Sequence, residues 1–288
     1  MIVVTGATGQ LGRLVIGELL KATEAKNIIA AVRTPAKADG LAGRGVQVRE
    51  ADYSRPKTLA TAFDGASRLL LISGNELGNR EEQHKAAIDA SKAAGVSFVA
   101  YTSILHCATS PLALAAEHLA TERYLLSSGL TYSFLRNGWY FENQTATIQS
   151  AIQNGAFIGA SGDGRFAAAS RSDYAIAAAE VLTGENHENT VLELGGDQPY
   201  TRAELAAEVS RQTGKVIGYK NISEAEYKKV LSNFLPAVLA DAIADAEAHA
   251  AQGALDDNSH TLSRLLGRPT TSLAQAVESA LRTPPAAH

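Results

Sequence analysis

The chain opens on the stretch IVVTGATGQLG at positions 2–12, which joins a short apolar run to a helical one through three glycines. The apolar run has the composition of a buried strand, and residues 10–23 repeat leucine and valine at helical spacing. At such a junction the glycines allow a tight turn, approach of the backbone to a pyrophosphate and close packing of the helix on the strand. The helix N-terminus adds N–H groups and a partial positive charge. The stretch therefore predicts a Rossmann-type phosphate-binding turn, against the alternative of a turn that is merely rich in glycine.

Apolar runs alternate with amphipathic helical segments through the first half of the chain, which is the pattern of parallel βαβ units. We expect strands at 28–32, 46–50, 69–72, 98–101 and 130–135. The run at 69–72 is apolar at every position, as expected where helices cover both faces of a sheet. The predicted fold class is α/β, with a Rossmann-type parallel sheet and helices on both faces.

After Arg136 the rhythm changes, because glycines cluster between 155 and 164 and the helices and strands follow less regularly. We expect later helices at 171–182, 202–213 and within 224–250, and later strands at 191–194 and 216–219. The predicted organisation is a nucleotide-binding domain over residues 1–136 and a smaller C-terminal α/β lobe over residues 137–288, partly interleaved with the first. The residues from Pro284 onward are expected to form a loose tail.

The composition excludes several classes of function. The chain has 26 Lys and Arg against 30 Asp and Glu, a net charge of −4, and no basic run, which argues against a nucleic-acid partner. Its single cysteine, Cys107, allows neither an intrachain disulfide nor a cysteine cluster, and no histidine spacing suggests a metal site. No apolar stretch reaches the roughly 18 residues of a membrane span, and no secretion signal is seen. The expected location is cytoplasmic, and a homodimer is allowed as the assembly.

The glycine spacing is G-x-x-G-x-x-G, one residue longer than the usual dehydrogenase fingerprint. With the preceding Val-Thr it resembles the opening of the extended and atypical short-chain dehydrogenase/reductases, above all of their NmrA-like branch. The resemblance covers nearly the whole chain and rests further on the stretches ADY at 51–53, LLIS at 70–73, AYTS at 100–103 and LRNGWY at 135–140. Within the branch, these stretches are most similar to the bacterial NAD(P)H:quinone oxidoreductases, and next to the triphenylmethane dye reductases.

The tip of the second expected strand favours NADPH over NADH. NAD-binding folds usually place an Asp or Glu there to hold the ribose 2′-hydroxyl. This chain has Arg33 instead, and no acid lies within the next five residues. A guanidinium can hold a 2′-phosphate through two hydrogen bonds, with Lys37 adding charge nearby. NADPH is therefore the predicted cofactor; the alternative is that Arg33 is a solvated surface arginine.

The resemblance assigns further cofactor contacts at the ends of the later strands. It places Asp52 at the adenine amino group, and Ser73 and Gly74 where the ribose and pyrophosphate pass. The alternatives are a surface acid for Asp52 and a plain turn residue for Asn75. The predicted cofactor-binding residues are Gly6, Ala7, Thr8, Gly9, Gln10, Leu11, Gly12, Arg33, Asp52, Ser73, Gly74, Asn75, Thr102 and Asn137.

The helix after the fifth strand lacks the Tyr-x-x-x-Lys pair with which most members of the superfamily deliver a proton. Aligned on Glu122, this helix has Leu114 at the tyrosine position and His118 at the lysine position. By resemblance, His118 hydrogen-bonds the nicotinamide ribose; the alternative is a histidine packed on a buried helix face. Ser103 resembles the family serine that hydrogen-bonds a substrate oxygen, unless it only caps the loop. His118 and Ser103 are the predicted catalytic residues.

Trp139, Tyr140 and Phe141 follow the sixth strand, at the edge where open α/β sheets bind ligands. Their flat rings suit a planar quinone or dye by stacking, although packing between the two lobes explains them as well. The predicted function is hydride transfer from NADPH to a quinone. Two alternatives stay open: an NADPH-dependent reductase of dyes or other small molecules, and a non-catalytic NADP(H) redox sensor of NmrA type.

Overall fold

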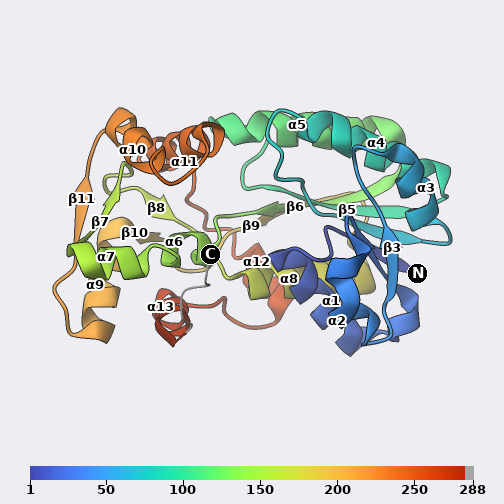
Figure 1. Ribbon diagram of the computed structural model, residues 1–288, viewed down its shortest axis with the longest axis horizontal. Coiled ribbons are helices and arrows are strands. Elements are labelled where there is room, and N and C mark those ends of the chain that lie inside the picture. Colours follow the sequence, from blue (N-terminus) through green and yellow to red (C-terminus); the bar gives the residue numbers. More distant parts are fainter. Residues whose placement is uncertain (283–288) are drawn as a thin grey trace. The chain divides into compact units, whose positions relative to one another are not determined.

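The six strands of the first half of the chain and one later strand form a single seven-stranded sheet (Figure 1). The computed structural model describes residues 1–282. In the order of the sheet, the strands are β3 (Gln47–Glu50), β2 (Ile28–Val32), β1 (Ile2–Thr5), β4 (Arg68–Leu71), β5 (Phe98–Ile104), β6 (Thr131–Asn137) and β9 (Thr190–Leu194). Strands β1 to β6 pair in parallel, with Val3 beside both Ile29 and Leu69. The strand order reverses between β1 and β4, which is the point where such sheets bind ligands at their carboxyl ends.

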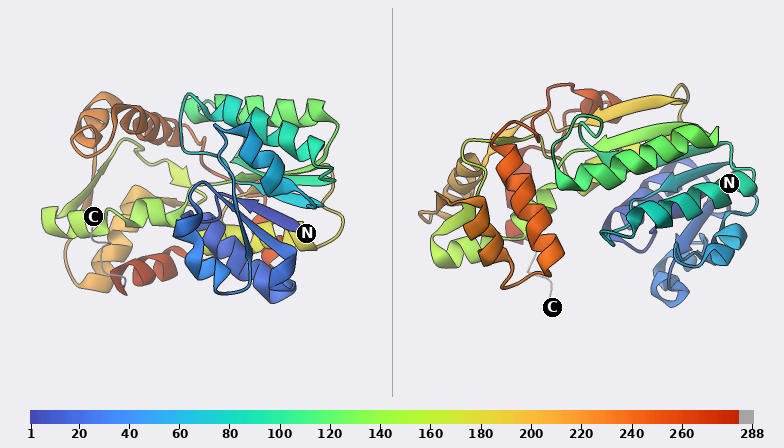
Figure 2. Two further views of the ribbon diagram at one scale, coloured as in Figure 1. Left: turned by 45° about the vertical axis from the view of Figure 1, so that its right-hand side comes forward. Right: turned by 90° about the horizontal axis from the view of Figure 1, so that it is seen from above.

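Helices cover both faces of this sheet, as predicted (Figure 1; Figure 2, left). One face carries α1 (Gln10–Ala22), α2 (Asp39–Ala42) and α8 (Arg171–Thr183), and the other carries α3 (Pro56–Phe63), α4 (Arg80–Ala93) and α5 (Ala113–Ser128). Two short 3₁₀ turns, η1 (Ala25–Asn27) and η2 (Pro35–Ala38), flank β2. Phe63 of α3 is buried in one apolar cluster with Val99, Tyr101 and Phe134 of the sheet. The predicted Rossmann-type α/β class is thus confirmed.

The chain divides into two compact units. Among the described residues, the first unit comprises 1–107, 116–137 and 171–192, and the second comprises 108–115, 138–170 and 193–282. The expected division fell between 136 and 137, with partial interleaving. Residues 171–192 belong to the first unit because α8, which lies within them, packs against α1 and β4. The predicted tail from Pro284 lies outside the described residues.

The second unit is built from short strands and helices. Its elements are α6 (Phe141–Thr145), α7 (Ile148–Asn154), β7 (Ala156–Gly159), β8 (Arg165–Phe166), β10 (Tyr200–Thr201), α9 (Arg202–Thr213), β11 (Gly218–Asn221), α10 (Glu224–Leu231), α11 (Ala237–Ala250), α12 (Thr261–Leu266) and α13 (Leu273–Arg282). Strand β8 pairs with β10 in antiparallel fashion, and β7 pairs with β11 in parallel. Among residues 1–282, no helix has the length and apolar character needed to cross a membrane, and no cluster of three or more metal-binding side chains occurs.

Candidate nucleotide-binding site

The glycine turn between β1 and α1 has the geometry that the sequence predicted. Gly6 has φ +57°, in the left-handed region that favours glycine, and its carbonyl accepts a hydrogen bond of 2.9 Å from the Gly9 N–H. A Cβ atom on Gly12 would lie 2.5 Å from the Gly6 carbonyl oxygen and 2.7 Å from Cα of Ala7. The third glycine position therefore admits no side chain, because α1 begins directly against the end of β1.

The first turn of α1 is open to an anion. Its N-cap residue, Gly9, supplies no side-chain cap, and the turn contains no acidic residue. The first N–H groups of a helix have no partner within it, and the helix dipole adds positive charge there. Arg13 donates from Nε to the Thr8 carbonyl at 2.8 Å and from Nη2 to the Lys37 carbonyl at 3.3 Å, which ties the glycine turn to the segment after β2. The turn thus has a geometry and a polarity that suit a phosphate group, and its contact with one stays a prediction.

A cavity of about 360 Å³ lies over this turn, within the usual size range of ligand pockets. It is lined by Gly6, Thr8, Gly9, Gln10, Leu11, Gly12, Arg33, Ala51, Asp52, Tyr53, Ile72, Ser73, Gly74, Asn75, Glu76 and Gln83. The predicted cofactor residues that do not line it are Ala7, Thr102 and Asn137, all of which are buried. The structure therefore brings the glycine turn, Arg33, Asp52 and the segment after β4 together around one cavity. That each of them contacts a cofactor stays a prediction.

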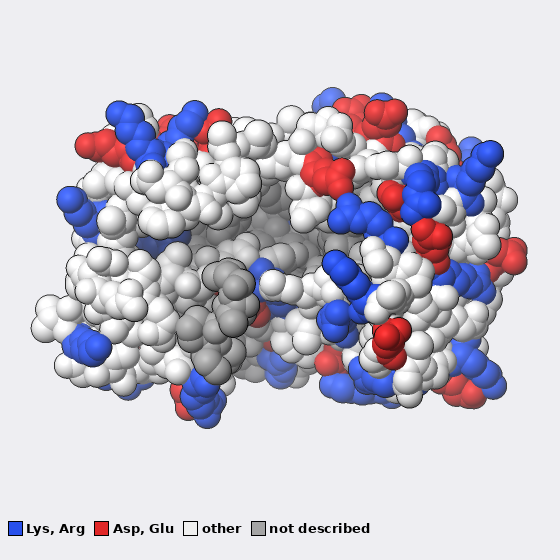
Figure 3. All heavy atoms as spheres, viewed as in Figure 1, with Lys and Arg blue, Asp and Glu red and all other residues white. Residues whose placement is uncertain are grey.

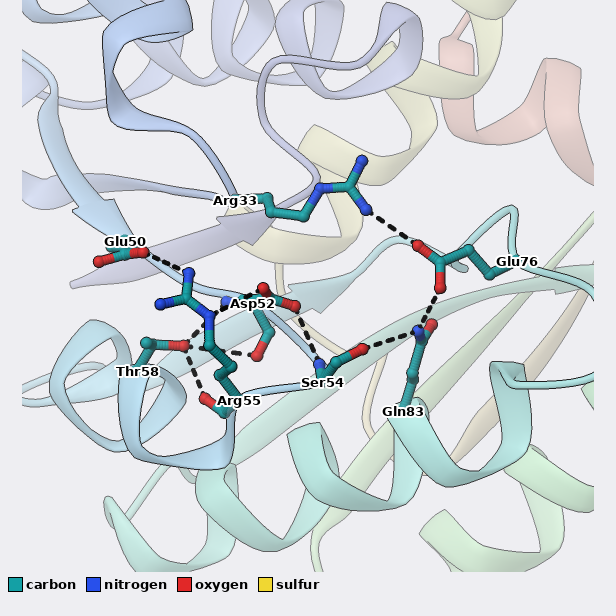
Figure 4. Close-up of polar contacts among 8 residues, drawn as sticks. All are labelled: Arg33, Glu50, Asp52, Ser54, Arg55, Thr58, Glu76 and Gln83. Atoms are coloured by element: carbon teal, nitrogen blue, oxygen red, sulfur yellow. Dashed lines mark hydrogen bonds and ion pairs between the residues drawn. The ribbon is translucent and has the colours of Figure 1, made fainter.

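Arg33 extends from the end of β2 toward the segment after β4 (Figure 4). Its Nη1 atom lies 2.9 Å from Oε1 of Glu76; the Arg33 side chain is exposed and that of Glu76 is half-buried. The other carboxylate oxygen of Glu76 accepts a hydrogen bond of 2.7 Å from Nε2 of Gln83 on α4. The same amide donates to Oγ of Ser54 at 3.2 Å. Arg33 is thus paired across the cavity with an acid that the sequence did not single out.

Asp52, at the end of β3, keeps its carboxylate on the cavity wall. Oδ1 accepts a hydrogen bond of 3.0 Å from the Ser54 N–H, and Oδ2 accepts one of 3.0 Å from Nε of Arg55 (Figure 4). Partial burial by itself raises the pKa of Asp52, but these two hydrogen bonds and the charges of Arg55 and Arg33 outweigh it and lower the pKa below 3.8. The group is therefore a carboxylate at neutral pH, so it is able to accept a hydrogen bond from an adenine amino group. That contact stays a prediction.

Side chains behind the cavity hold the segment after β4. Oγ1 of Thr102, on β5, accepts a hydrogen bond of 2.8 Å from the Ser73 N–H. Nε2 of His84, on α4, accepts one of 3.0 Å from the Gly74 N–H, and Nε of Arg80 donates to the Gly74 carbonyl at 2.8 Å. Burial, followed by the charge of Arg80, lowers the pKa of His84 to about 3, so the ring is neutral and keeps its acceptor nitrogen. The peptide of Gly74 is thus fixed at both its N–H and its carbonyl.

His118 lies on α5 and is buried in the first unit. Its Nδ1 atom is 2.7 Å from the hydroxyl of Tyr101 on β5, and the two rings are tilted with centroids 5.9 Å apart. Burial, then the charge of Arg80, holds the pKa of His118 well below its usual value. Burial also raises the pKa of Tyr101, so the phenol keeps its proton. With the phenol as donor to Nδ1, the neutral ring carries its own proton on Nε2. His118 therefore does not reproduce the positive charge of the family lysine.

Ser103 forms part of a buried ionic cluster. Its Oγ donates a hydrogen bond of 2.6 Å to Oε1 of Glu122 on α5. Arg136 on β6 donates to both oxygens of the same carboxylate, from Nε at 3.0 Å and from Nη2 at 2.7 Å. In this arrangement the Ser103 hydroxyl donates its proton to the hydrogen bond with Glu122. A role for Ser103 toward a substrate oxygen stays a prediction and requires that proton to be redirected.

The predicted substrate residues all belong to the second unit. Phe141 is 2 % exposed, and its ring stacks on that of Tyr200 with centroids 5.4 Å apart and planes inclined by 11°. Trp139 and Tyr140 are half-buried, and Ala169 donates to the Trp139 carbonyl at 3.1 Å. Phe141 is therefore packed inside the second unit, against Tyr200. The substrate contacts of all three residues stay predictions.

Three polar residues at the site escaped the sequence interpretation. Glu76 and Gln83 line the cavity, and Arg13 braces the glycine turn. Arg13 directly follows Gly12, so its place in the motif was a signal that could have been used. Glu76 lies among the turn-forming residues after β4, where the sequence gives no indication of side-chain direction.

Comparison with known proteins decides the family. The chain matches the NAD(P)H-binding family over residues 6–185, a region that contains the glycine turn and every residue lining the cavity. The chain belongs to the NAD(P)H-binding family. Within it, the chain is 52 % identical over 278 residues to the Quinone oxidoreductase 2 of Escherichia coli (strain K12), covering 96 % of this chain and 97 % of that protein.

Two solved structures share the fold over nearly the whole chain. The crystal structure of the E. coli NADPH-dependent quinone oxidoreductase QOR2 complexed with NADPH superposes with a TM-score of 0.96, at 51 % identity, covering 98 % of this chain and all of that one. The triphenylmethane reductase of Citrobacter sp., complexed with NADP(H), superposes with a TM-score of 0.94, at 39 % identity, covering 97 % of this chain and all of that one. The resemblance to these two groups of reductases, noted from sequence stretches, is thereby confirmed.

Proposed function

We propose that this protein is an NADPH-dependent reductase that transfers hydride to a quinone. The observation that carries the proposal is its full-length similarity to a quinone oxidoreductase, together with Arg33 on the same cavity as the glycine turn. The turn and the first N–H groups of α1 suit a pyrophosphate, and Arg33 suits a 2′-phosphate. NADPH, when bound, supplies the hydride.

The missing Tyr-Lys pair fits a quinone as acceptor. Reduction of an ordinary ketone forms a strongly basic alkoxide, so a positioned acid is valuable. A quinone that accepts hydride becomes a phenolate, whose conjugate acid has a pKa near that of tyrosine, about 10. With Leu114 and a neutral His118 at the two positions, the chain supplies orientation and proximity instead of a strong proton donor.

We infer that His118 orients the nicotinamide ribose through its Nε2–H. Replacing His118 with alanine is expected to raise the KM for NADPH about 2- to 10-fold, the value of one neutral hydrogen bond, and to change kcat much less. His118→Gln, which keeps an amide N–H donor, should recover part of the loss. Steady-state kinetics with NADPH as the varied substrate measure the separate effects on KM and kcat. His187→Ala, in the loop after α8, is the control. Unchanged KM values in both His118 variants would remove His118 from the site.

Reduction of cationic dyes is the second candidate function. It is favoured by the similarity, at 39 % identity over nearly the whole chain, to the Citrobacter triphenylmethane reductase. Both candidate functions use the same nucleotide and differ in the electron acceptor, so one assay with both acceptors separates them.

The test is the loss of NADPH absorbance in the presence of purified protein and a simple benzoquinone. Parallel reactions contain NADH in place of NADPH, a triphenylmethane dye in place of the quinone, or no acceptor. We expect rapid oxidation that depends on the quinone and is faster with NADPH. Turnover of the dye alone would assign the second function. Binding of nucleotide without turnover of either acceptor would refute both and leave a redox sensor.

The charge distribution agrees with a small-molecule substrate. On the face drawn in Figure 3, basic and acidic side chains are intermixed over helices α1 to α4 instead of forming one broad basic field. The cytoplasmic location and the homodimer expected from the sequence stay predictions. Cell fractionation and light scattering on the purified protein measure them directly.

A further inference from the structure

The adenosine end of the cavity has an unusual balance of charge for a site that is to hold a 2′-phosphate. Among the described residues that line the cavity, Arg33 is the one with a cationic side chain, whereas Asp52 and Glu76 are both acidic. Asp52 is bonded to Arg55 and to the Ser54 N–H. Glu76 instead forms its ion pair with Arg33 itself. The cation on which a 2′-phosphate depends is therefore already paired.

Glu76 is held in this place independently of Arg33. Oε2 accepts the hydrogen bond of 2.7 Å from Gln83, while Oε1 faces the guanidinium at 2.9 Å (Figure 4). The Gln83 side chain is itself fixed, because the residue is 8 % exposed and its amide also donates to Ser54. A carboxylate anchored through one oxygen presents the other at a defined position.

NADPH and NADH are expected to interact differently with the Glu76 carboxylate. A 2′-phosphate that binds Arg33 comes within reach of a second anion at the same guanidinium, so Glu76 competes for the cation and repels the ligand. A bare 2′-hydroxyl is a hydrogen-bond donor, and a carboxylate at the adenosine ribose is what NAD-binding folds use to accept from it. In those folds the acid stands at the tip of the second strand, where this chain has Arg33.

We propose that Glu76 is a specificity-determining residue, which weakens the binding of NADPH and supports the binding of NADH. It replaces, from the segment after β4, the acid that is missing at the tip of β2. The proposal rests on the proposed function only in that the cavity binds a nicotinamide dinucleotide. Arg33 supplies the preference for NADPH, and Glu76 limits it, so the chain is built to accept both nucleotides to different degrees.

The test is the equilibrium binding of NADPH and NADH to Glu76→Gln, measured by isothermal titration calorimetry without any quinone. The variant keeps the size of the side chain and removes its charge. We expect the Kd for NADPH to fall about fivefold and the Kd for NADH to rise about two- to fivefold, the range of an exposed charge interaction. Glu82→Gln is the matched control, because it removes the same charge from an exposed position on α4 that does not line the cavity.

Binding of adenosine 2′,5′-bisphosphate and of 5′-AMP isolates the adenosine end of the site. The ratio of their Kd values should change in the same direction in Glu76→Gln and stay constant in Glu82→Gln. Equal changes for phosphorylated and unphosphorylated ligands, or no change, would overturn the proposal, as would a wild-type protein that binds neither dinucleotide. A shifted ratio in a protein that reduces no quinone would uphold the role of Glu76 and refute the proposed function alone.

Discussion

Arg33→Glu is expected to raise the KM for NADPH about 100-fold or more, and to change the KM for NADH by no more than a few-fold. The guanidinium is the cationic side chain on the described cavity wall, and its loss removes charge-assisted hydrogen bonds worth about 1.5–3 kcal/mol to the 2′-phosphate. The new carboxylate would add repulsion beside Glu76, which the structure holds through Gln83. NADH carries no 2′-phosphate and loses only indirect contacts. The preference between the two nucleotides should therefore reverse.

Steady-state kinetics with each nucleotide, at constant ionic strength, measure this reversal. Arg44→Glu is the matched control, since it makes the same change of charge at an exposed turn that does not line the cavity. It should leave both KM values near those of the wild type. A similar loss for NADPH and NADH in Arg33→Glu would mean that Arg33 supports the turn and not the 2′-phosphate.

The sheet could be predicted because its signals are local. The run at 69–72 is apolar throughout, as is natural for a parallel strand under two layers of helices, and β4 was found within one residue. The requirement for glycine at positions 6 and 12 was predictable because it arises from steric limits that act within a few residues of the turn. The placement of α8 beside α1 depends on packing between residues roughly 150 or more positions apart, and no local sequence pattern predicts it.

For the site, the sequence predicted residues at fixed places of the fold but not their side-chain partners. Arg33 was found because the tip of the second strand is a fixed place in the fold. The partners of the predicted residues come from elsewhere in the chain: Glu76 reaches Arg33 over 43 positions, and Glu122 reaches Ser103 over 19. For His118, the sequence predicted the position but not the charge of the side chain. Its position in the motif suggested a substitute for lysine, whereas its burial beside Tyr101 leaves the ring neutral.

Gly12→Ala is expected to raise the Kd for NADPH at least about 100-fold and to lower the stability of the fold by about 1–3 kcal/mol, the usual cost of overpacking. The added methyl would lie 2.5 Å from the Gly6 carbonyl oxygen and 2.7 Å from Cα of Ala7. Both are backbone atoms of the turn, so relief requires α1 to move away from the end of β1. That movement displaces the N–H groups that the pyrophosphate needs, and the loss of binding should exceed the loss of stability.

Gly17→Ala on the same helix is the control. An added Cβ there has no neighbouring atom within 4 Å, so the substitution should stabilise the protein by about 0.5–1 kcal/mol through helix propensity. Urea unfolding measures stability and calorimetry measures binding in both variants. If Gly12→Ala bound NADPH like Gly17→Ala, the close contact of α1 with β1 would not be what shapes the phosphate site. If only stability fell, the third glycine would serve packing alone, and the pyrophosphate would have to lie away from the first turn of α1.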